Sequence, residues 1–387
     1  MRVCLDKSLF SSNKHLVVDL DSYSWEEAPL KCDLFSAGEK DSSLNKFLSL
    51  YEIEGISFLE EKYIKMVASL GIRNPDWKNI LPSAKYQTYK RNLQEKAKFV
   101  KKFIENDHYS YFFSKGNLIL NRLEPAAIDI DKLLKFTQQE ENNNLKTILK
   151  SFQPEANGFA KLVDYDRLKT VTGRLVVKSG PQFLLLPKEY KSIIKSRHGN
   201  EGIIAYIDFV SLEPRFAKLS IESKSPDDIY EDIVENNDFD FDRKTMKSLV
   251  LATIFGAGVN KLSEIAGQEA FAVQKAISKY FGFNKILEKA GDYNSGTIKN
   301  FFGRPIKLKK RVKNVAINNY IQSSSVDVAL MGFSKLLLPN SAYPVAVVHD
   351  ALVVDLLKTD LPKLKSIINR GIEISDLGHF RLGVELL

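Results

Sequence analysis

The sequence predicts an α+β protein whose functional side chains lie where strands end. Residues 203–207 form a short apolar run typical of a buried strand, and Asp208 follows directly. A second apolar run, residues 343–348, is followed by His349 and Asp350 and then by further apolar residues. An isolated carboxylate at the end of an apolar strand is costly unless it is paired or binds a metal. Two such strands are what a two-metal phosphoryl-transfer site requires.

Length, composition and net charge limit the classes of protein to which this chain can belong. A length of 387 residues predicts two or three domains, and a 44% hydrophobic content provides a sizeable core. The net charge of +8 favours a polyanionic partner, although ribosome-like or membrane-surface binding gives the same balance. The cysteines, Cys4 and Cys32, exclude a disulfide framework and a cysteine zinc site. With no signal-peptide core and no apolar run of about 18 residues, we expect a cytoplasmic protein, in the nucleoid or a host cell, without a membrane partner.

Three stretches in this order resemble the motifs of the family A (polymerase I-like) DNA polymerases. Residues 206–215 resemble motif A, usually written DYSQIELR. Residues 243–256 resemble motif B, RxxxKxxxFGxxYG, and residues 348–350 resemble motif C, VHDE. The resemblance covers residues 118–387. The residues of motif A in register are Asp208, Leu212, Glu213 and Arg215.

The resemblance implies a right-hand polymerase fold with an antiparallel-sheet palm, helical fingers and a reduced helical thumb, preceded by a small α/β region. The stretch between Glu124 and Thr172 is much shorter than its family counterpart, so the thumb is reduced to little more than a helical hairpin. The expected divisions are an N-terminal region at 1–117, the thumb at 118–168, the palm at 169–225 and 301–387, and the fingers at 226–300.

The resemblance also implies the chemistry. Asp208, Asp350 and the Phe209 carbonyl are expected to bind two Mg²⁺ ions, which would activate the primer 3′-hydroxyl and neutralise the triphosphate. Lys247 is expected to protonate the leaving pyrophosphate. The family usually has glutamate after the motif C aspartate, and Ala351 stands there in this chain.

Nucleotide binding is expected on one face of the motif B helix. Arg243 and Lys247 are four residues apart, where like charges repel, so an anion such as a triphosphate should lie between them. Leu251 and Phe255 continue this face towards the base. Leu251 replaces a family aromatic residue and Phe255 a tyrosine, which implies altered sugar discrimination. The resemblance adds Ser211, Glu213 and Tyr230 to the nucleotide site, where Glu213 would block a ribose 2′-hydroxyl and Tyr230 would replace a histidine that binds the β-phosphate.

Other segments resemble the family's DNA-contacting elements. Residues 170–175 resemble TxTGRL, residues 302–304 resemble FGR, and residues 316–322 resemble AINxxxQ. These contacts would check the geometry of the primer-template end rather than its sequence. The expected DNA-binding residues are Thr172, Arg174, Arg304, Asn318, Gln322 and His349.

Residues 1–117 resemble no family. We expect a strand at 16–20, a loop-like stretch at 41–55 and helices at 58–70 and 82–106. Basic residues and tyrosines alternate in the last helix, which suits a nucleic-acid groove, although a solvated helix face is an equal alternative. They are Lys85, Tyr86, Tyr89, Lys90, Arg91, Lys96, Lys98, Lys101 and Lys102.

Several alternatives remain open. Asp19-Leu20-Asp21 after an apolar run resembles the first carboxylate pair of a proofreading exonuclease, but the region is too short for that domain and we expect no proofreading. A single-subunit RNA polymerase is a second interpretation, against which Glu213 argues. A degenerate polymerase kept as a DNA-binding replisome scaffold is a third. Primer-template DNA and deoxynucleoside triphosphates are the expected partners, and a processivity or replisome partner is left open.

Overall fold

The computed structural model describes residues 1–29, 31–37, 42–54, 59–72 and 75–387. The chain divides into two compact units, Met1–Asn117 and Leu118–Leu387, and each is described by itself. None of the helices in the described ranges combines the length and apolar composition that a membrane crossing needs.

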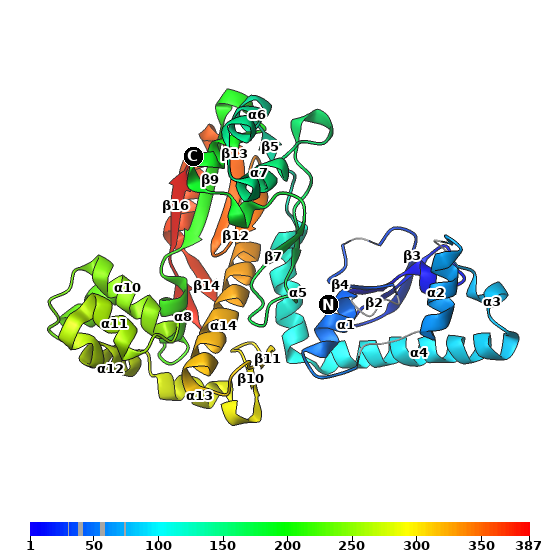
Figure 1. Ribbon diagram of the computed structural model, residues 1–387, viewed down its shortest axis with the longest axis horizontal. Helices are drawn as coiled ribbons and strands as arrows, with labels where there is room; N and C mark the ends of the chain where they lie inside the picture. Colours follow the sequence, from blue (N-terminus) through cyan, green and yellow to red (C-terminus); the bar gives the residue numbers. More distant parts are fainter. Residues whose placement is uncertain (30, 38–41, 55–58, 73–74) are drawn as a thin grey trace. The chain divides into compact units, whose positions relative to one another are not determined.

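The first unit is built on a four-stranded sheet in the order β3-β2-β1-β4 (Figure 1). β1 pairs with β2 antiparallel and with β4 parallel, and β2 pairs with β3 antiparallel. The predicted strand at 16–20 is confirmed as β2. The strands are β1 (Val3–Leu5), β2 (His15–Val18), β3 (Tyr23–Glu26) and β4 (Leu34–Ser36).

Helices cover this sheet, and the predicted helix at 82–106 is confirmed as α4 (Ser83–Asn106). The expected loop at 41–55 is wrong at residues 43–49, which form α1, whereas residues 50–54 are turn or irregular as expected and residues 41 and 55 lie outside the described residues. Ser42 accepts a hydrogen bond from the Asn45 amide and thereby caps α1. Of the predicted helix at 58–70, Phe58 lies outside the described residues and the remainder forms α2. The other helices of the unit are α1 (Ser43–Ser49), α2 (Glu61–Ser69), α3 (Trp77–Ile80) and α5 (His108–Asn121), which runs into the second unit.

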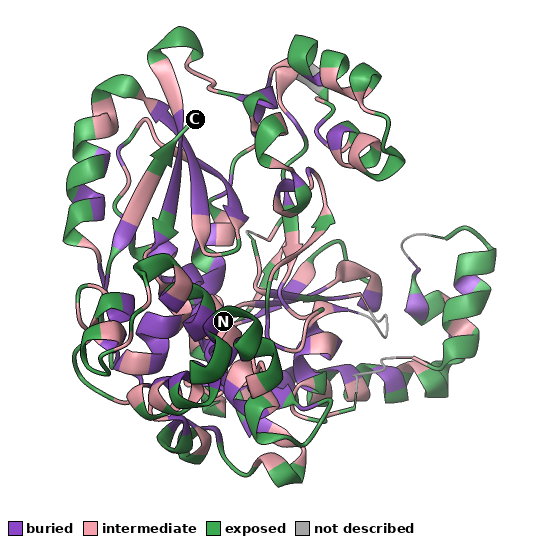
Figure 2. Cartoon of the chain, turned by 60° about the vertical axis from the view of Figure 1, so that its left-hand side comes forward, coloured by how far each residue is buried: buried purple, intermediate pink, exposed green. Residues whose placement is uncertain are grey.

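The second unit contains an antiparallel sheet in the order β12-β13-β9-β16, which confirms the predicted antiparallel sheet. The central strand β9 is apolar on both faces because both faces are covered, as the buried colouring of these strands shows (Figure 2). On one face Phe209 packs against Phe333 of α14, with ring centroids 5.2 Å apart. The strands are β9 (Gly202–Phe209), β12 (Tyr343–Val348), β13 (Ala351–Leu357) and β16 (Leu382–Leu386).

The other face of the sheet is covered by a helical hairpin, α6 (Ile130–Gln139) and α7 (Asn143–Lys150). Leu133 and Leu149 belong to the same buried cluster as Tyr206 of the sheet. The residues that would form a reduced thumb are therefore packed onto the sheet in this structure. Their assignment as a thumb stays a prediction.

The remaining helices of the second unit gather around α14 (Lys313–Lys335) and in a group at one end of β9 (Figure 1). That group lies within the region expected to form the fingers. The helices are α8 (Leu212–Leu219), α9 (Ile229–Glu235), α10 (Arg243–Ile254), α11 (Val259–Ala266), α12 (Ala270–Tyr280), α13 (Phe283–Ala290) and α15 (Leu361–Arg370). The short strands are β5 (Ala127–Ile128), β6 (Asp164–Asp166), β7 (Val176–Ser179), β8 (Ile194–Lys195), β10 (Thr297–Lys299), β11 (Pro305–Lys307), β14 (Ile372–Ile374) and β15 (Gly378–Phe380).

A buried polar network joins Asp327 of α14 to two loop residues, Arg167 and Asn300. Arg167 Nη2 lies 3.0 Å from Asp327 Oδ1, and both side chains are 3% exposed. Asn300 Nδ2 donates to the other oxygen of Asp327 at 2.7 Å. A buried ion pair is costly to desolvate, and here both carboxylate oxygens of Asp327 have a partner, Arg167 for Oδ1 and Asn300 for Oδ2.

Removing one member of this network should destabilise the second unit. We expect Asp327→Ala to lower the free energy of unfolding by about 3–5 kcal/mol, because it leaves the Arg167 charge buried without its carboxylate. The matched control is Asp164→Ala, which removes the exposed pair with Lys178 at 3.4 Å and should cost at most about 1 kcal/mol. Urea unfolding of the two variants measures the difference, and equal costs would contradict the assignment.

Candidate active site

Asp208 and Asp350 lie side by side at one end of the central strands β9 and β13. Asp208 is the penultimate residue of β9 and is paired with Ala351 of β13. His349 and Asp350 form the two-residue turn between β12 and β13, and His349 has a left-handed φ of 56°. The Phe209 N–H donates to the Asp350 carbonyl at 3.2 Å. The turn is thus bonded directly to the end of β9, which holds the two aspartates together.

Small residues flank Asp208 on both neighbouring strands. Ala351 lies opposite it on β13 and Gly383 lies opposite it on β16. A Cβ atom at Gly383 would lie 2.8 Å from Asp208 Oδ1, closer than such atoms approach one another. The glycine therefore leaves the space that the carboxylate occupies.

The electrostatics of the pair disfavour the charged form of Asp350. Burial raises the pKa of Asp350, and the charge of Asp208 raises it further. His349 and Lys247 act in the opposite direction. The two aspartates are therefore close enough to repel each other, and Lys247 is close enough to attract them. Such a pair is stabilised by added positive charge.

Helix α10 presents the predicted nucleotide-binding face to solvent. Asp242 caps the helix by accepting from the Thr245 amide at 2.7 Å. Met246, Leu249, Val250, Thr253 and Ile254 are buried on the opposite side. Arg243 and Lys247 are exposed, Leu251 is half-buried, and Phe255, just beyond the helix, is 42% exposed. The four residues thus share the open face that their spacing predicts.

Arg243 is held by a carboxylate that our sequence analysis did not identify. Its Nε donates to Asp228 Oδ2 at 2.6 Å, and its guanidinium lies over the Tyr230 ring, 5.3 Å from the centroid. Burial opposes ionisation of Asp228, yet the Arg243 bond and the amides of α9 lower its pKa overall. Because this bond uses Nε and the side chain is 48% exposed, the terminal nitrogens of Arg243 are not used by Asp228 and are donors of the kind that bind an anion.

Tyr230 is 1% exposed, so its phenol does not reach solvent. Burial raises its pKa, and a hydrogen bond with Ser211 opposes that shift. Ser211 itself has a left-handed φ of 55° where β9 turns into α8. In this arrangement the Tyr230 phenol and the Ser211 hydroxyl bond to each other at the turn between β9 and α8. The expected contact from Tyr230 to a phosphate would therefore require the Tyr230 ring to move.

Glu213 lies in the first turn of α8 between the aspartates and Arg174. Burial raises the pKa of Glu213, Asp350 raises it further, and Arg174 opposes both. The Arg174 Nη2 to Glu213 Oε1 distance is 3.8 Å. Arg174 therefore connects the 170–175 loop to the residue expected to select the sugar.

The remaining expected DNA-binding residues differ in accessibility. His349 is exposed, and Asn318 and Gln322 are half-buried on α14. Thr172 is buried. Arg304 is 1% exposed, and its Nη2 lies 3.3 Å from the carbonyl oxygens of both Arg167 and Thr170. We therefore correct the role of Arg304: it supports the 170–175 loop, and its guanidinium is not available to DNA.

Other functional residues escaped the sequence analysis for a common reason. Asp228 and Gly383 act through partners distant in sequence, and only strand register or burial reveals them. Arg215 is similar: motif A contains it, but its role is to donate to the carbonyls of Pro226 and Asp227 at 3.0 and 3.1 Å. It thereby places the loop that carries Asp228. Among the described residues, no group of three or more His, Cys, Asp or Glu side chains is arranged to hold a metal.

Comparisons with known proteins give limited information. No protein-family model matches the chain, and no curated protein gives a significant match. One similar solved structure is the polymerase domain of Pol1 from M. smegmatis, in complex with DNA primer-template and dNTP. The TM-score is 0.47 at 16% identity, over 67% of this chain and 55% of that chain. The chain thus spans about half of that structure, and a likeness of this degree does not establish a shared function.

The close approach of Gly383 to Asp208 can be tested. Gly383→Ala should displace the Asp208 carboxylate and reduce the primer extension expected from the family resemblance by at least about tenfold, an effect of roughly 1.4 kcal/mol. The melting temperature should not fall, because alanine is favoured over glycine in a strand by about 0.5–1 kcal/mol. Unchanged extension would show that Asp208 is not confined by β16.

Proposed function

We propose that this protein is a template-directed DNA polymerase that adds deoxynucleotides to a primer 3′-hydroxyl by a two-metal-ion mechanism, without proofreading. The observation that carries the proposal is the pair Asp208 and Asp350, held together at one end of the central strands. The family A resemblance of the three motifs, in order, supports the same function.

The donor set fits Mg²⁺. This ion prefers oxygen ligands and takes one or two protein carboxylates, with waters and substrate phosphates completing its shell. Asp208, Asp350 and the Phe209 carbonyl would supply such ligands. When bound, the two ions would lower the pKa of the 3′-hydroxyl and neutralise the triphosphate. The raised pKa of Asp350 shows that its ionised form is disfavoured, and a bound cation would offset this.

Helix α10 would bind the nucleotide. Arg243 and Lys247 lie one turn apart on the open face, so the phosphates can contact both. Lys247, whose positive charge lowers the pKa of Asp350, can donate a proton to the departing pyrophosphate. Leu251 and Phe255 offer an apolar continuation of this face to the base and sugar.

Glu213 supports the choice of deoxyribonucleotides. Its side chain is mostly buried beside Asp350 and held by Arg174, so it cannot move freely to admit a 2′-hydroxyl. A single-subunit RNA polymerase has a small residue at this position. The scaffold alternative is disfavoured because the chain keeps Asp208, Asp350, Arg243 and Lys247. Proofreading is not part of the proposal because Asp19, whose carboxylate accepts from the Leu20 amide and lies 3.8 Å from Arg2, is explained by a local turn.

The proposal is tested by extension of a labelled primer-template with Mg²⁺, with dNTPs and rNTPs offered separately. Extension with dNTPs alone is the expected result. Extension with rNTPs would favour an RNA polymerase. No extension with either, together with tight DNA binding, would favour the scaffold.

Asp350→Asn should have opposite effects on activity and stability. Extension should fall by at least about a thousandfold, or roughly 4 kcal/mol, because a metal ligand is lost. A raised native pKa means that Asp350 favours folding only below its unfolded pKa, and this contribution is lost as the pH rises through the native pKa. At pH 7 without Mg²⁺ the neutral asparagine should therefore raise the melting temperature by a few degrees. Normal extension, or a lower melting temperature, would contradict the site.

Glu213→Ala should relax sugar selection. Ribonucleotide incorporation relative to deoxyribonucleotide incorporation should rise by about tenfold or more, because a steric clash of about 1–3 kcal/mol is removed. The control is Glu222→Ala, which removes an exposed carboxylate paired with Lys218 outside the site. Unchanged sugar selectivity in the Glu213 variant would exclude this residue as the gate.

A further inference from the structure

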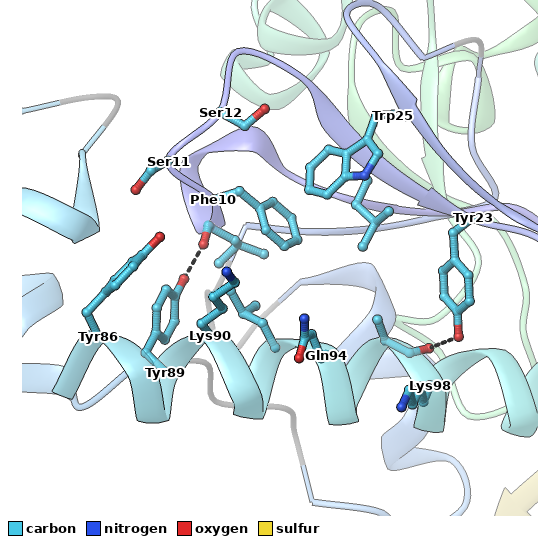
Figure 3. Close-up of a pocket in the computed structure, with 14 residues that line it drawn as sticks. Phe10, Ser11, Ser12, Tyr23, Trp25, Tyr86, Tyr89, Lys90, Gln94 and Lys98 are labelled. Atoms are coloured by element: carbon cyan, nitrogen blue, oxygen red, sulfur yellow. Dashed lines mark hydrogen bonds between the residues drawn. The ribbon is translucent and has the colours of Figure 1, made fainter. Parts of the chain in front are cut away.

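An open groove of about 530 Å³ lies in the first unit, between the sheet and α4 (Figure 3). Tyr23 and Trp25 are two residues apart on β3, so their side chains point to the same face of the sheet. Leu16 is paired with Trp25 and lies on that face as well. Helix α4 runs along this face, and the Tyr23 hydroxyl donates to the Ala97 carbonyl at 3.5 Å. The groove is therefore part of the fold of this unit alone.

Aromatic rings form one wall of the groove. Trp25 is 50% exposed and Tyr23 is 43% exposed, although each packs against a neighbour. The Phe10 and Trp25 rings meet edge to face, with centroids 5.0 Å apart and an interplanar angle of 80°. This contact fixes the plane of the indole and leaves much of its surface open. Fixed and exposed aromatic surface is what a stacking ligand requires.

The opposite wall is polar and basic. Lys90, Gln94 and Lys98 follow one another at intervals of four along α4, and all three are exposed (Figure 3). Within the described part of the chain, neither Lys90 nor Lys98 forms an ion pair, and no carboxylate lines the groove. The charge along this wall is therefore uncompensated and complementary to an anion.

Tyr89 closes the floor and is not part of the binding surface. It is 4% exposed, and its hydroxyl donates to the Leu9 carbonyl (Figure 3). Burial raises the pKa of this phenol. The expectation that the tyrosines of this helix stack on bases therefore does not hold for Tyr89, and the exposed rings come instead from the sheet.

We propose that this groove binds single-stranded nucleic acid, with bases stacked on Trp25, Tyr23 and Phe10 and backbone phosphates bound by Lys90 and Lys98. Alternating aromatic and basic contacts are how proteins bind single strands without sequence preference. A duplex does not fit this chemistry, because its base faces are already stacked. An apolar peptide would use the rings but leave the two lysines without partners. The proposal does not rest on polymerase activity.

Trp25 provides a local reporter. The chain has two tryptophans, and Trp77 is 5% exposed with its indole N–H bonded to the Ser8 carbonyl at 2.7 Å. A single strand that stacks on Trp25 should quench its fluorescence, whereas strands bound in the other unit would not stack on it. The titration uses the full chain with oligodeoxythymidylate and oligouridylate of about 12 nucleotides, and a DNA duplex of the same length. Quenching should vanish in Trp25→Ala.

The basic wall is tested with Lys90→Gln/Lys98→Gln. This variant should bind the single strand about tenfold more weakly, and the slope of log K against log salt should decrease by about 1.4, at roughly 0.7 for each phosphate contact. The control is Lys102→Gln, which removes an exposed lysine of the same helix that does not line the groove and should leave affinity unchanged. Circular dichroism melting checks that each variant is folded.

The outcomes separate the possibilities. Quenching by either single strand supports the proposal, and the comparison of the two strands shows whether DNA or RNA is preferred. No quenching, equal quenching by the duplex, or the same loss in the Lys102 control would overturn it. Loss of primer extension with intact quenching would instead contradict only the proposed polymerase function.

Discussion

The constraint on which the candidate site depends is that the sheet holds two carboxylates side by side although their charges repel. Asp208 ends the central strand, and Asp350 sits in the turn that is bonded to it. Burial and the neighbouring charge of Asp208 disfavour the ionised form of Asp350 and raise its pKa. A fold retains such a cost only where a cation offsets it or function requires it. The small residues beside Asp208 and the positive charge of Lys247, which lowers the pKa of Asp350, are both consistent with this constraint.

Two further charged pairs belong to the candidate site. Arg243 is paired with Asp228, and Arg174 with Glu213. These pairs place each basic group without burying it, so its remaining hydrogen-bond donors stay available for an anionic ligand. Arg215 and Arg304 are different, because both are buried and donate to backbone carbonyls. Arginines of the same motif-rich region therefore divide into those that can meet a ligand and those that shape the loops carrying the others.

The first unit also leaves basic side chains exposed, here beside aromatic rings. Its sheet is small, and one face is closed by the apolar side of α4. The polar residues of α4 lie beside the exposed rings of the edge strand β3. A groove is left open between them. The rings that remain exposed there, Tyr23 and Trp25, are the ones available to a stacking ligand.

The sequence by itself determined the local features of this protein. Apolar runs and the 3.6-residue period predicted β9, the β12–β13 turn, α4 and the open face of α10, because each of these depends on neighbours a few positions away. Only the tertiary structure decided that Gly383 makes room for Asp208, that Asp228 holds Arg243, that Arg304 is buried, and that the helices of the expected thumb pack onto the sheet. A periodic pattern shows which face of an element is apolar, but not which distant residue will lie against it. Register and burial arise from contacts between segments far apart in the chain, and these decided which charged side chains remain free to act.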